Sequence, residues 1–189
     1  MRRFTVTDFC HQFITAQVHE GAFCIDATAG NGHDTEFLCR LVGGSGKVLA
    51  FDIQQAAVTA TQNRLAENHL DHIGHVVLDS HHHLCQYAPP DSVDCVMFNF
   101  GYLPGGDHAK ATKPETSLSA VRQSLTCLKP GGLLCLCIYS GGDTGFEERD
   151  TILSYIKGLD PHEYLVILSS YANRPGNPPI PAFIFKNVR

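Results

Sequence analysis

Short apolar runs alternate with helical stretches along most of the 189-residue chain, and this alternation restricts the possible folds more than any other feature. The first five runs are nearly continuously apolar, which is typical of strands buried on both faces of a parallel sheet. The pattern therefore predicts a doubly wound, Rossmann-like α/β fold. The predicted strands are Ala22–Ala27, Lys47–Asp52, Gly74–Asp79, Val93–Phe100, Gly132–Tyr139, Glu163–Tyr171 and Pro181–Val188, and the predicted helices are Thr7–His19, Asp34–Val42, Ala56–Asn68, Glu115–Leu128 and Phe146–Leu159.

The last two predicted strands are joined by a segment that cannot form a crossover helix. Residues 172–179 contain three prolines, two asparagines and a glycine. Because parallel neighbours need a long crossover, these two strands should pair antiparallel. We therefore expect a seven-stranded, mainly parallel sheet with an antiparallel C-terminal hairpin, in a single domain over residues 1–189.

The composition argues against several classes of protein. No apolar run approaches the ~20 residues that span a membrane, and the N-terminus lacks the apolar core of a signal peptide, so a cytoplasmic protein is expected. A net charge of −5 argues against a generally basic nucleic-acid coat protein, although it allows an enzyme with a local basic patch. The eight cysteines contain no C-x-x-C spacing, and we interpret them as small buried apolar residues.

A glycine-rich loop, Asp26-Ala-Thr-Ala-Gly-Asn-Gly-His-Asp34, follows the first predicted strand and opens a helix. Its two glycines can adopt positive φ and let the backbone approach a ligand closely, and the helix start offers free N–H groups. Asp52 lies 20 residues after Gly32, at the end of the second strand, where a carboxylate can accept hydrogen bonds from ribose hydroxyls. The combination predicts a site for a nucleoside cofactor rather than a simple turn.

The loop favours S-adenosylmethionine over NAD. A dinucleotide site needs a third glycine, which is missing here. Asp26 would repel a pyrophosphate, but it could help to bind the amino group of an amino-acid-bearing nucleoside. Asp79 and Ser80 end the third strand and should lie beside the adenine. The expected cofactor-binding residues are Asp26, Thr28, Ala29, Gly30, Asn31, Gly32, His33, Asp34, Asp52, Gln54, Asp79, Ser80 and His81.

A second motif, Asn99-Phe-Gly-Tyr-Leu-Pro-Gly-Gly-Asp107, follows the fourth strand and should face the same crevice. It is similar to the Asn/Asp-Pro-Pro-aromatic motif of amino-group methyltransferases, with Phe-Gly in place of Pro-Pro. Asn99 offers an amide oxygen, Phe100 and Gly101 offer backbone carbonyls, and Tyr102 offers an aromatic face. Acceptors of this kind can hold the hydrogens of an amine and aim its lone pair at a methyl carbon. We therefore expect Asn99 and Tyr102 to position an amine.

These two motifs, with Thr112-Lys-Pro-Glu-Thr116, Ile138-Tyr139 and Asn177-Pro178-Pro179, resemble the YtqB-like family of putative rRNA methylases over nearly the whole chain. The resemblance implies a class I methyltransferase fold with S-adenosylmethionine as cofactor. It also implies methyl transfer to the aminomethyl nitrogen of 5-aminomethyl-(2-thio)uridine at the tRNA wobble position. Ser140 departs from the family pattern, in which a histidine is expected.

The catalytic candidates are Asn99, Tyr102 and Tyr139, of which Tyr139 should close the pocket; Phe100, Gly101, Lys113 and Arg174 are the candidates for substrate binding. The alternatives are an rRNA or small-molecule amine N-methyltransferase, or a cofactor-binding partner protein without activity. Because the chain has few positive charges, we expect a homodimer to grip the anticodon stem-loop, with the final hairpin at its interface. The run His81–His83 with Cys85 is not expected to bind a metal, because adjacent side chains diverge.

Overall fold

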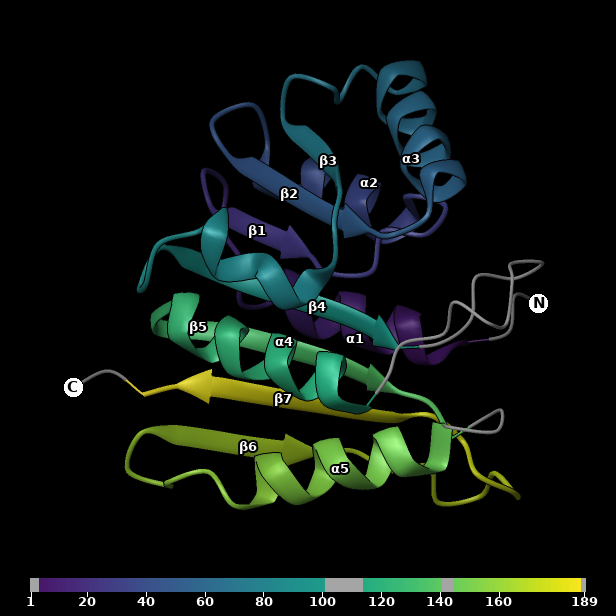
Figure 1. Cartoon of the computed structure of the whole chain (residues 1–189), viewed down its shortest axis with the longest axis vertical. Helices are drawn as coiled ribbons and strands as arrows, with labels where there is room; N and C mark the ends of the chain where they lie inside the picture. Colours follow the sequence, from purple (N-terminus) through teal and green to yellow (C-terminus); the bar gives the residue numbers. More distant parts are fainter. Residues whose placement is uncertain (1–3, 101–113, 141–144, 188–189) are drawn as a thin grey trace.

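The computed structural model describes residues 4–100, 114–140 and 145–187. Seven strands form one mainly parallel sheet with an antiparallel C-terminal hairpin, as the sequence predicted, and their order is β3-β2-β1-β4-β5-β7-β6 (Figure 1). β7 runs opposite to the other six strands. The strands are β1 (Phe23–Asp26), β2 (Lys47–Asp52), β3 (Gly74–Leu78), β4 (Val93–Phe100), β5 (Leu128–Ile138), β6 (Tyr164–Leu168) and β7 (Ile180–Lys186).

Helices cover both faces of this sheet. The helices are α1 (Val6–Thr15), α2 (His33–Val42), α3 (Gln55–Glu67), α4 (Pro114–Cys127) and α5 (Gly145–Lys157), with a 3-10 helix η1 (His81–Gln86). Buried residues of α4, α5 and η1 form one core with the sheet, on the near side in Figure 1, and buried residues of α1, α2 and α3 form the other. Within the described ranges, none of the helices is long and apolar enough to cross a membrane.

The C-terminal hairpin is inserted into the sheet rather than added at its end. β7 pairs with β5 on one side and with β6 on the other, so Phe183 lies between Cys135 and Ile167. Phe183 and Phe185 face the α1 side, and Ile180 and Ile184 face the α4 side. Both edges of β7 are paired, so the open edge of the hairpin belongs to β6.

The strand order reverses between β1 and β4, and this reversal creates the crevice in which α/β sheets bind ligands. The register pairs Asp26 with Met97, so the loop that leaves β1 lies beside Asn99 in β4. The parallel strands all end at this edge, to the right in Figure 1. The glycine loop and Asn99, the first residue of the second motif, are therefore brought to one place.

The cysteines confirm their interpretation as small core residues. All eight are free thiols, and seven of them are buried; Cys85 is exposed. Two pairs approach closely, with 3.3 Å between the sulfurs of Cys10 and Cys137 and between those of Cys85 and Cys127.

Replacing Gly46 by alanine should destabilise the fold, because a Cβ there would lie 2.4 Å from the Cβ of Val42 and 2.8 Å from the carbonyl oxygen of Ala22. Backbone cannot move aside cheaply, so we expect a loss of about 1–3 kcal/mol in the free energy of unfolding, measured by urea denaturation. Gly44→Ala is the matched control, since nothing lies within 4 Å of its added Cβ. Equal stability of the two variants would contradict this packing.

Candidate active site

The glycine loop has the backbone conformation that the sequence predicted. Gly30 and Gly32 have φ of 53° and 76°, and Gly32 is the N-cap of α2. A Cβ at Gly32 would lie 3.0 Å from the Cα of Thr61 in α3, and the Thr61 hydroxyl donates to the carbonyl of Gly30 at 3.2 Å. Glycine is therefore required at position 32 by both its φ and the close approach of α3.

Arg64, one turn after Thr61 in α3, fixes the outer side of the loop. Its Nε donates to the carbonyl oxygen of Asn31 at 2.7 Å, and its guanidinium also lies 3.0 Å from Glu36 and 3.2 Å from the His33 ring. The contact that His33 makes in the structure is thus with Arg64 of α3. Sequence reasoning missed Arg64, because a contact across 33 residues leaves no local signal.

Asp52 accepts hydrogen bonds from the backbone of the loop and keeps lone pairs that can accept further ones. One carboxylate oxygen accepts from the N–H of Gly30 at 3.0 Å, and the other accepts from the N–H of Gln54 at 2.9 Å. Each oxygen has a second lone pair, which suits the two hydroxyls of a ribose. The next residue, Ile53, is 51% exposed and offers an apolar surface for a flat base. The sequence analysis overlooked Ile53, although an apolar residue directly after this acid is the available signal.

Asp79 is already engaged by the start of η1. One oxygen accepts from the N–H of Ser80 at 2.7 Å and from His83 at 2.8 Å, and the other accepts from the Tyr87 hydroxyl at 2.8 Å. The hydrogen bond from His83 lowers the pKa of Asp79, so the carboxylate stays ionised. One acceptor position remains on the second oxygen, and a bond to the exocyclic amine of adenine stays a prediction.

His81 lies behind the loop. Burial lowers its pKa to about 4, so the ring is neutral and its Nδ1 donates to the carbonyl of Ala27 at 3.2 Å. The ring also meets Phe98 edge to face, at 5.7 Å between centroids. These contacts explain the burial of His81, and its place in an adenine pocket remains a prediction.

Asp26 has no exposed surface, so its expected help in binding an amino group would have to act through the loop and stays a prediction. Its two carboxylate oxygens accept from the N–H of Thr28 at 3.1 Å and from the hydroxyl of Thr35 at 2.6 Å. A fully buried carboxylate cannot touch a ligand, so Asp26 instead fixes the turn between β1 and α2. Burial, together with the nearby charge of Asp34, raises the pKa of Asp26 to about 7.

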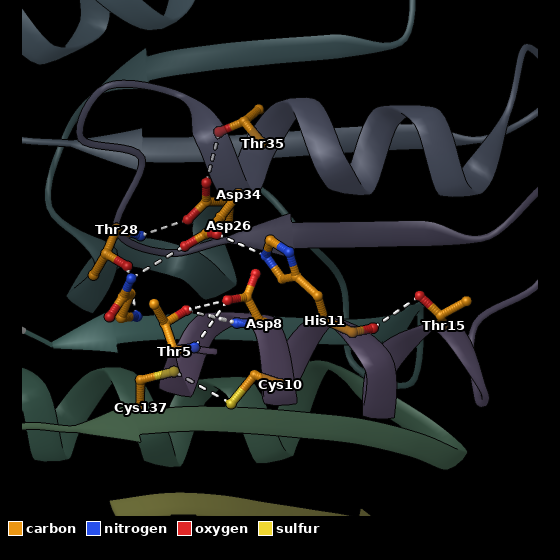
Figure 2. Close-up of polar contacts among 11 residues, drawn as sticks. Thr5, Asp8, Cys10, His11, Thr15, Asp26, Thr28, Asp34, Thr35 and Cys137 are labelled. Carbon is orange, nitrogen blue, oxygen red and sulfur yellow. Dashed lines mark hydrogen bonds and ion pairs between the residues drawn. The ribbon is translucent and has the colours of Figure 1, made fainter. Parts of the chain in front are cut away.

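Asp34 connects three elements at the centre of the site (Figure 2). One of its oxygens accepts from His11 of α1 at 2.8 Å, and the other accepts from the side-chain amide of Asn99 at 3.3 Å. The His11 ring is stacked on Phe37 at 3.7 Å, which fixes its orientation. Because the Asn99 nitrogen is used by Asp34, the Asn99 oxygen is the atom left to accept from a substrate. His11 was not predicted, since α1 was assigned only the role of covering the sheet.

The backbone of Asn99 is held as well. Its N–H donates to the hydroxyl of Thr28 at 2.8 Å, which ties the second motif to the glycine loop. Phe100 has a buried side chain stacked on Phe98, so only its backbone could meet a substrate. Gly101, Tyr102 and Lys113 lie outside the described residues.

Tyr139, directly after β5, lies against α1. Its hydroxyl is hydrogen-bonded to Thr7, and burial raises the pKa of Tyr139 to about 12. The phenol is therefore protonated at neutral pH. Ser140, where the family pattern led us to expect histidine, is buried and accepts from Arg149 at 3.3 Å.

The three consecutive histidines have three different partners, as expected from divergent side chains. His81 contacts the Ala27 carbonyl, His82 the Ser80 hydroxyl and His83 the Asp79 carboxylate. Within residues 4–100, 114–140 and 145–187, no group of three or more His, Cys, Asp or Glu side chains could hold a metal ion.

The donor set fits S-adenosylmethionine. A carboxylate with spare lone pairs ends β2, an exposed apolar side chain follows it, and a glycine loop at a helix start lies next to both. When bound, this cofactor supplies an electrophilic methyl group on a sulfonium. Asn99, whose side-chain nitrogen donates to Asp34, offers its oxygen as an acceptor for a nucleophile at the same edge of the sheet.

Asp26→Asn should flatten the pH dependence of stability. The folded state keeps a proton on Asp26 up to about pH 7, whereas the unfolded chain releases it near pH 4. The parent should therefore lose stability as the pH rises from about 4 to 7, by at most about 4 kcal/mol from this group. Urea unfolding at pH 5 and at pH 7.5 measures the difference. Asp71→Asn, at an exposed carboxylate, is the control, and equal pH dependence in all three proteins would contradict the assignment.

Comparisons with known proteins agree with this site. A family model described as "Putative rRNA methylase" matches residues 48–185. A tRNA (mnm(5)s(2)U34)-methyltransferase, chloroplastic, from Arabidopsis thaliana is 32% identical over 97% of this chain and 70% of the relative.

Two solved structures are similar over almost their whole lengths. A putative rRNA-methylase from Clostridium thermocellum has a TM-score of 0.93 and 39% identity, and covers 98% of this chain and 100% of its own. A putative methyltransferase from Streptococcus mutans, solved in complex with SAH, has a TM-score of 0.86 and 32% identity, and covers 98% of this chain and 99% of its own. The chain thus belongs to the family described as "Putative rRNA methylase", and it is an S-adenosylmethionine-dependent methyltransferase.

Proposed function

We propose that this enzyme methylates the aminomethyl nitrogen of 5-aminomethyl-(2-thio)uridine at the wobble position of tRNA. The observation that carries the proposal is the carboxamide of Asn99, whose nitrogen is held by Asp34 so that its oxygen can accept from an amine. The name of the Arabidopsis relative, which specifies a modified wobble uridine, supports the same substrate. We also propose that the enzyme acts in the cytoplasm.

The residues of the site suit an amine without a dedicated general base. We expect the alkylammonium to release its proton to solvent as it enters, because burial disfavours the charged form and the nearby Asp34 carboxylate already accepts from His11 and Asn99. The Asn99 oxygen then accepts one N–H of the neutral amine and orients the nitrogen lone pair. Tyr139, protonated and held by Thr7, closes the side of the pocket next to α1. Alignment of the two reacting groups supplies most of the acceleration.

An rRNA or a small-molecule amine is the alternative substrate, and the family description favours rRNA among these. A cofactor-binding partner protein without activity is the remaining alternative. Labelled S-adenosylmethionine, incubated with aminomethylated tRNA, unmodified tRNA, rRNA and free aminomethyluridine, separates them. Label in the aminomethylated tRNA alone supports the proposal, and label in any other substrate, or in none, contradicts it.

Asn99→Ala should lower kcat by about tenfold to a thousandfold, as expected when one positioning group is lost. The affinity for S-adenosylmethionine should change little, because Asn99 aims the nucleophile. Single-turnover methylation and isothermal titration measure the two quantities. Asn187→Ala is the matched control, since its amide is hydrogen-bonded too, to backbone carbonyls at 3.2 Å and 3.1 Å, but it follows β7 and so lies at the opposite edge of the sheet. Normal turnover by Asn99→Ala would contradict the role of Asn99 in positioning the amine.

We also propose that the enzyme is a homodimer that pairs through an apolar patch on edge strand β6. Leu165, Ile167 and Leu168 are 53%, 36% and 39% exposed there, and an exposed apolar edge invites pairing with a second copy. A two-fold contact would also bring together the few positive side chains of two copies, which in one copy are too few to bind RNA.

The double variant Leu165→Asp/Leu168→Asp should convert a dimer into a 20.7 kDa monomer, because two charges on each edge would repel across the two-fold axis. Light scattering over a dilution series measures the mass of the parent and the variant. Glu163→Asp, next to the strand, is a control for solubility. A parent protein that remains monomeric at micromolar concentration would contradict the proposed dimer.

A further inference from the structure

A hollow of about 240 Å³ lies where β5 ends and β7 begins, outside the site described above. It is on the carboxyl edge of the parallel strands, and its wall includes Ser140, which directly follows Tyr139. The main lining side chains are Ser140, Arg149, Tyr171, Arg174, Asn177 and Pro179. The hollow is therefore a neighbour of the proposed methyl-transfer site on the β5 side.

Arg174 is held in place at this hollow. Its guanidinium lies over the ring of Tyr171, 4.3 Å from the centroid, and one nitrogen donates to the carbonyl oxygen of Phe4 at 3.0 Å. Among the described residues, Arg174 has no carboxylate partner within ion-pair distance. A fixed guanidinium with remaining N–H donors and no counter-charge is suited to bind an oxyanion.

Arg149 supplies a second guanidinium to the same hollow. It lies over the ring of Phe146 at 4.9 Å and donates to the hydroxyl of Ser140 at 3.3 Å. Arg149 is also paired with Asp150, through Nε at 2.8 Å and a terminal nitrogen at 2.7 Å, so Arg174 is the guanidinium of the hollow without a described counter-charge. The two arginines thus reach the hollow from two different elements, α5 and the segment before β7.

Tyr171 supplies the ring that holds Arg174 at the hollow. Its hydroxyl is buried and makes no hydrogen bond in the described part of the chain. Burial raises the pKa of Tyr171, so the hydroxyl keeps its proton. Because the hydroxyl oxygen is not accessible, Tyr171 serves the hollow through its ring and not through its hydroxyl.

A second hollow, between α4 and α5, shows why the first one selects an anion. Arg122 lies there over the ring of Tyr155 at 5.0 Å, in the same arrangement as Arg174 over Tyr171. Two carboxylates, Glu147 and Asp150, line that second hollow together with Arg122. Among the described residues, no acid lines the first hollow.

We propose that the hollow between Arg149 and Arg174 binds a backbone phosphate of the tRNA, at a linkage close to the methylated nucleotide. The inference rests on the proposed tRNA substrate and adds the point at which its backbone is held. Phosphate contacts supply much of the affinity of proteins for nucleic acids. In a chain of net charge −5, two fixed guanidiniums beside the reaction site are where such a contact can form.

The first test measures binding of a synthetic anticodon stem-loop RNA by fluorescence anisotropy at several salt concentrations. Arg174→Ala should weaken binding about tenfold and reduce the slope of log K against log salt by about one unit or slightly less. Tyr171→Phe keeps the ring beneath Arg174 and removes only the inaccessible hydroxyl, so it should bind the stem-loop as the parent does. Arg122→Ala is the matched control and should bind as the parent does. Equal affinity and slope for the parent and Arg174→Ala would overturn the proposal.

The second test locates the contact. Single linkages of the stem-loop are replaced in turn by uncharged methylphosphonates, and each RNA is measured with the parent and with Arg174→Ala. One linkage near the wobble position should weaken parent binding yet have little further effect in the variant, because both changes remove the same interaction. Additive effects at every linkage would show that Arg174 acts at a distance, and would overturn the proposal. If the parent binds the stem-loop but does not methylate aminomethylated tRNA, the proposed function fails, while this cycle still decides whether the hollow holds a phosphate.

Discussion

The Asp34 carboxylate is the interaction on which the arrangement of the site depends. It joins His11 from α1 and Asn99 from β4 to the first turn of α2. These three segments come from distant parts of the sequence, and each is also held by packing: His11 on Phe37, and Asn99 through its backbone to Thr28. With the carboxamide nitrogen committed to Asp34, the direction of the Asn99 oxygen follows from the fold itself. The group that would receive the substrate is therefore oriented before any substrate arrives.

A second carboxylate, Asp26, lies behind the first and has a different role. It is fully buried and bonded only to the loop that it supports. Burial, with a smaller contribution from the nearby Asp34, raises the pKa of Asp26 to about 7, so Asp26 holds a proton below about that pH. Asp34 instead accepts from His11 and Asn99. The two acids thus have different roles because their surroundings differ.

The sequence allowed most of the fold to be predicted, because short apolar runs bounded by turns are strong local signals. β2 and β4 begin and end at the predicted residues. The first helix ends at Thr15 and not at His19, because Val18 continues the apolar pattern from a turn in which its N–H bonds to Ile14. The insertion of β7 beside β5 could not be predicted, since the hairpin signal gives the pairing of two strands but not which of them joins the sheet. The loop glycines and Asp52 could be singled out from their spacing in the sequence. His11, Arg64 and Thr7 could not, because their contacts are with residues far away in the chain and follow no sequence motif.

The position of β7 has a consequence for the order of assembly. β5 and β6 are separated in the sheet by a strand that follows both of them in the chain. Until β7 has left the ribosome, the edge of β5 that faces away from β4 is unpaired, and β6 has no partner strand in the described sheet. Completion of the sheet therefore waits for the final segment, and contacts between distant residues are the slow ones to form. During synthesis, the apolar β5 edge is the part of the chain most exposed to wrong pairing, and the protein depends on rapid closure by β7 to prevent it.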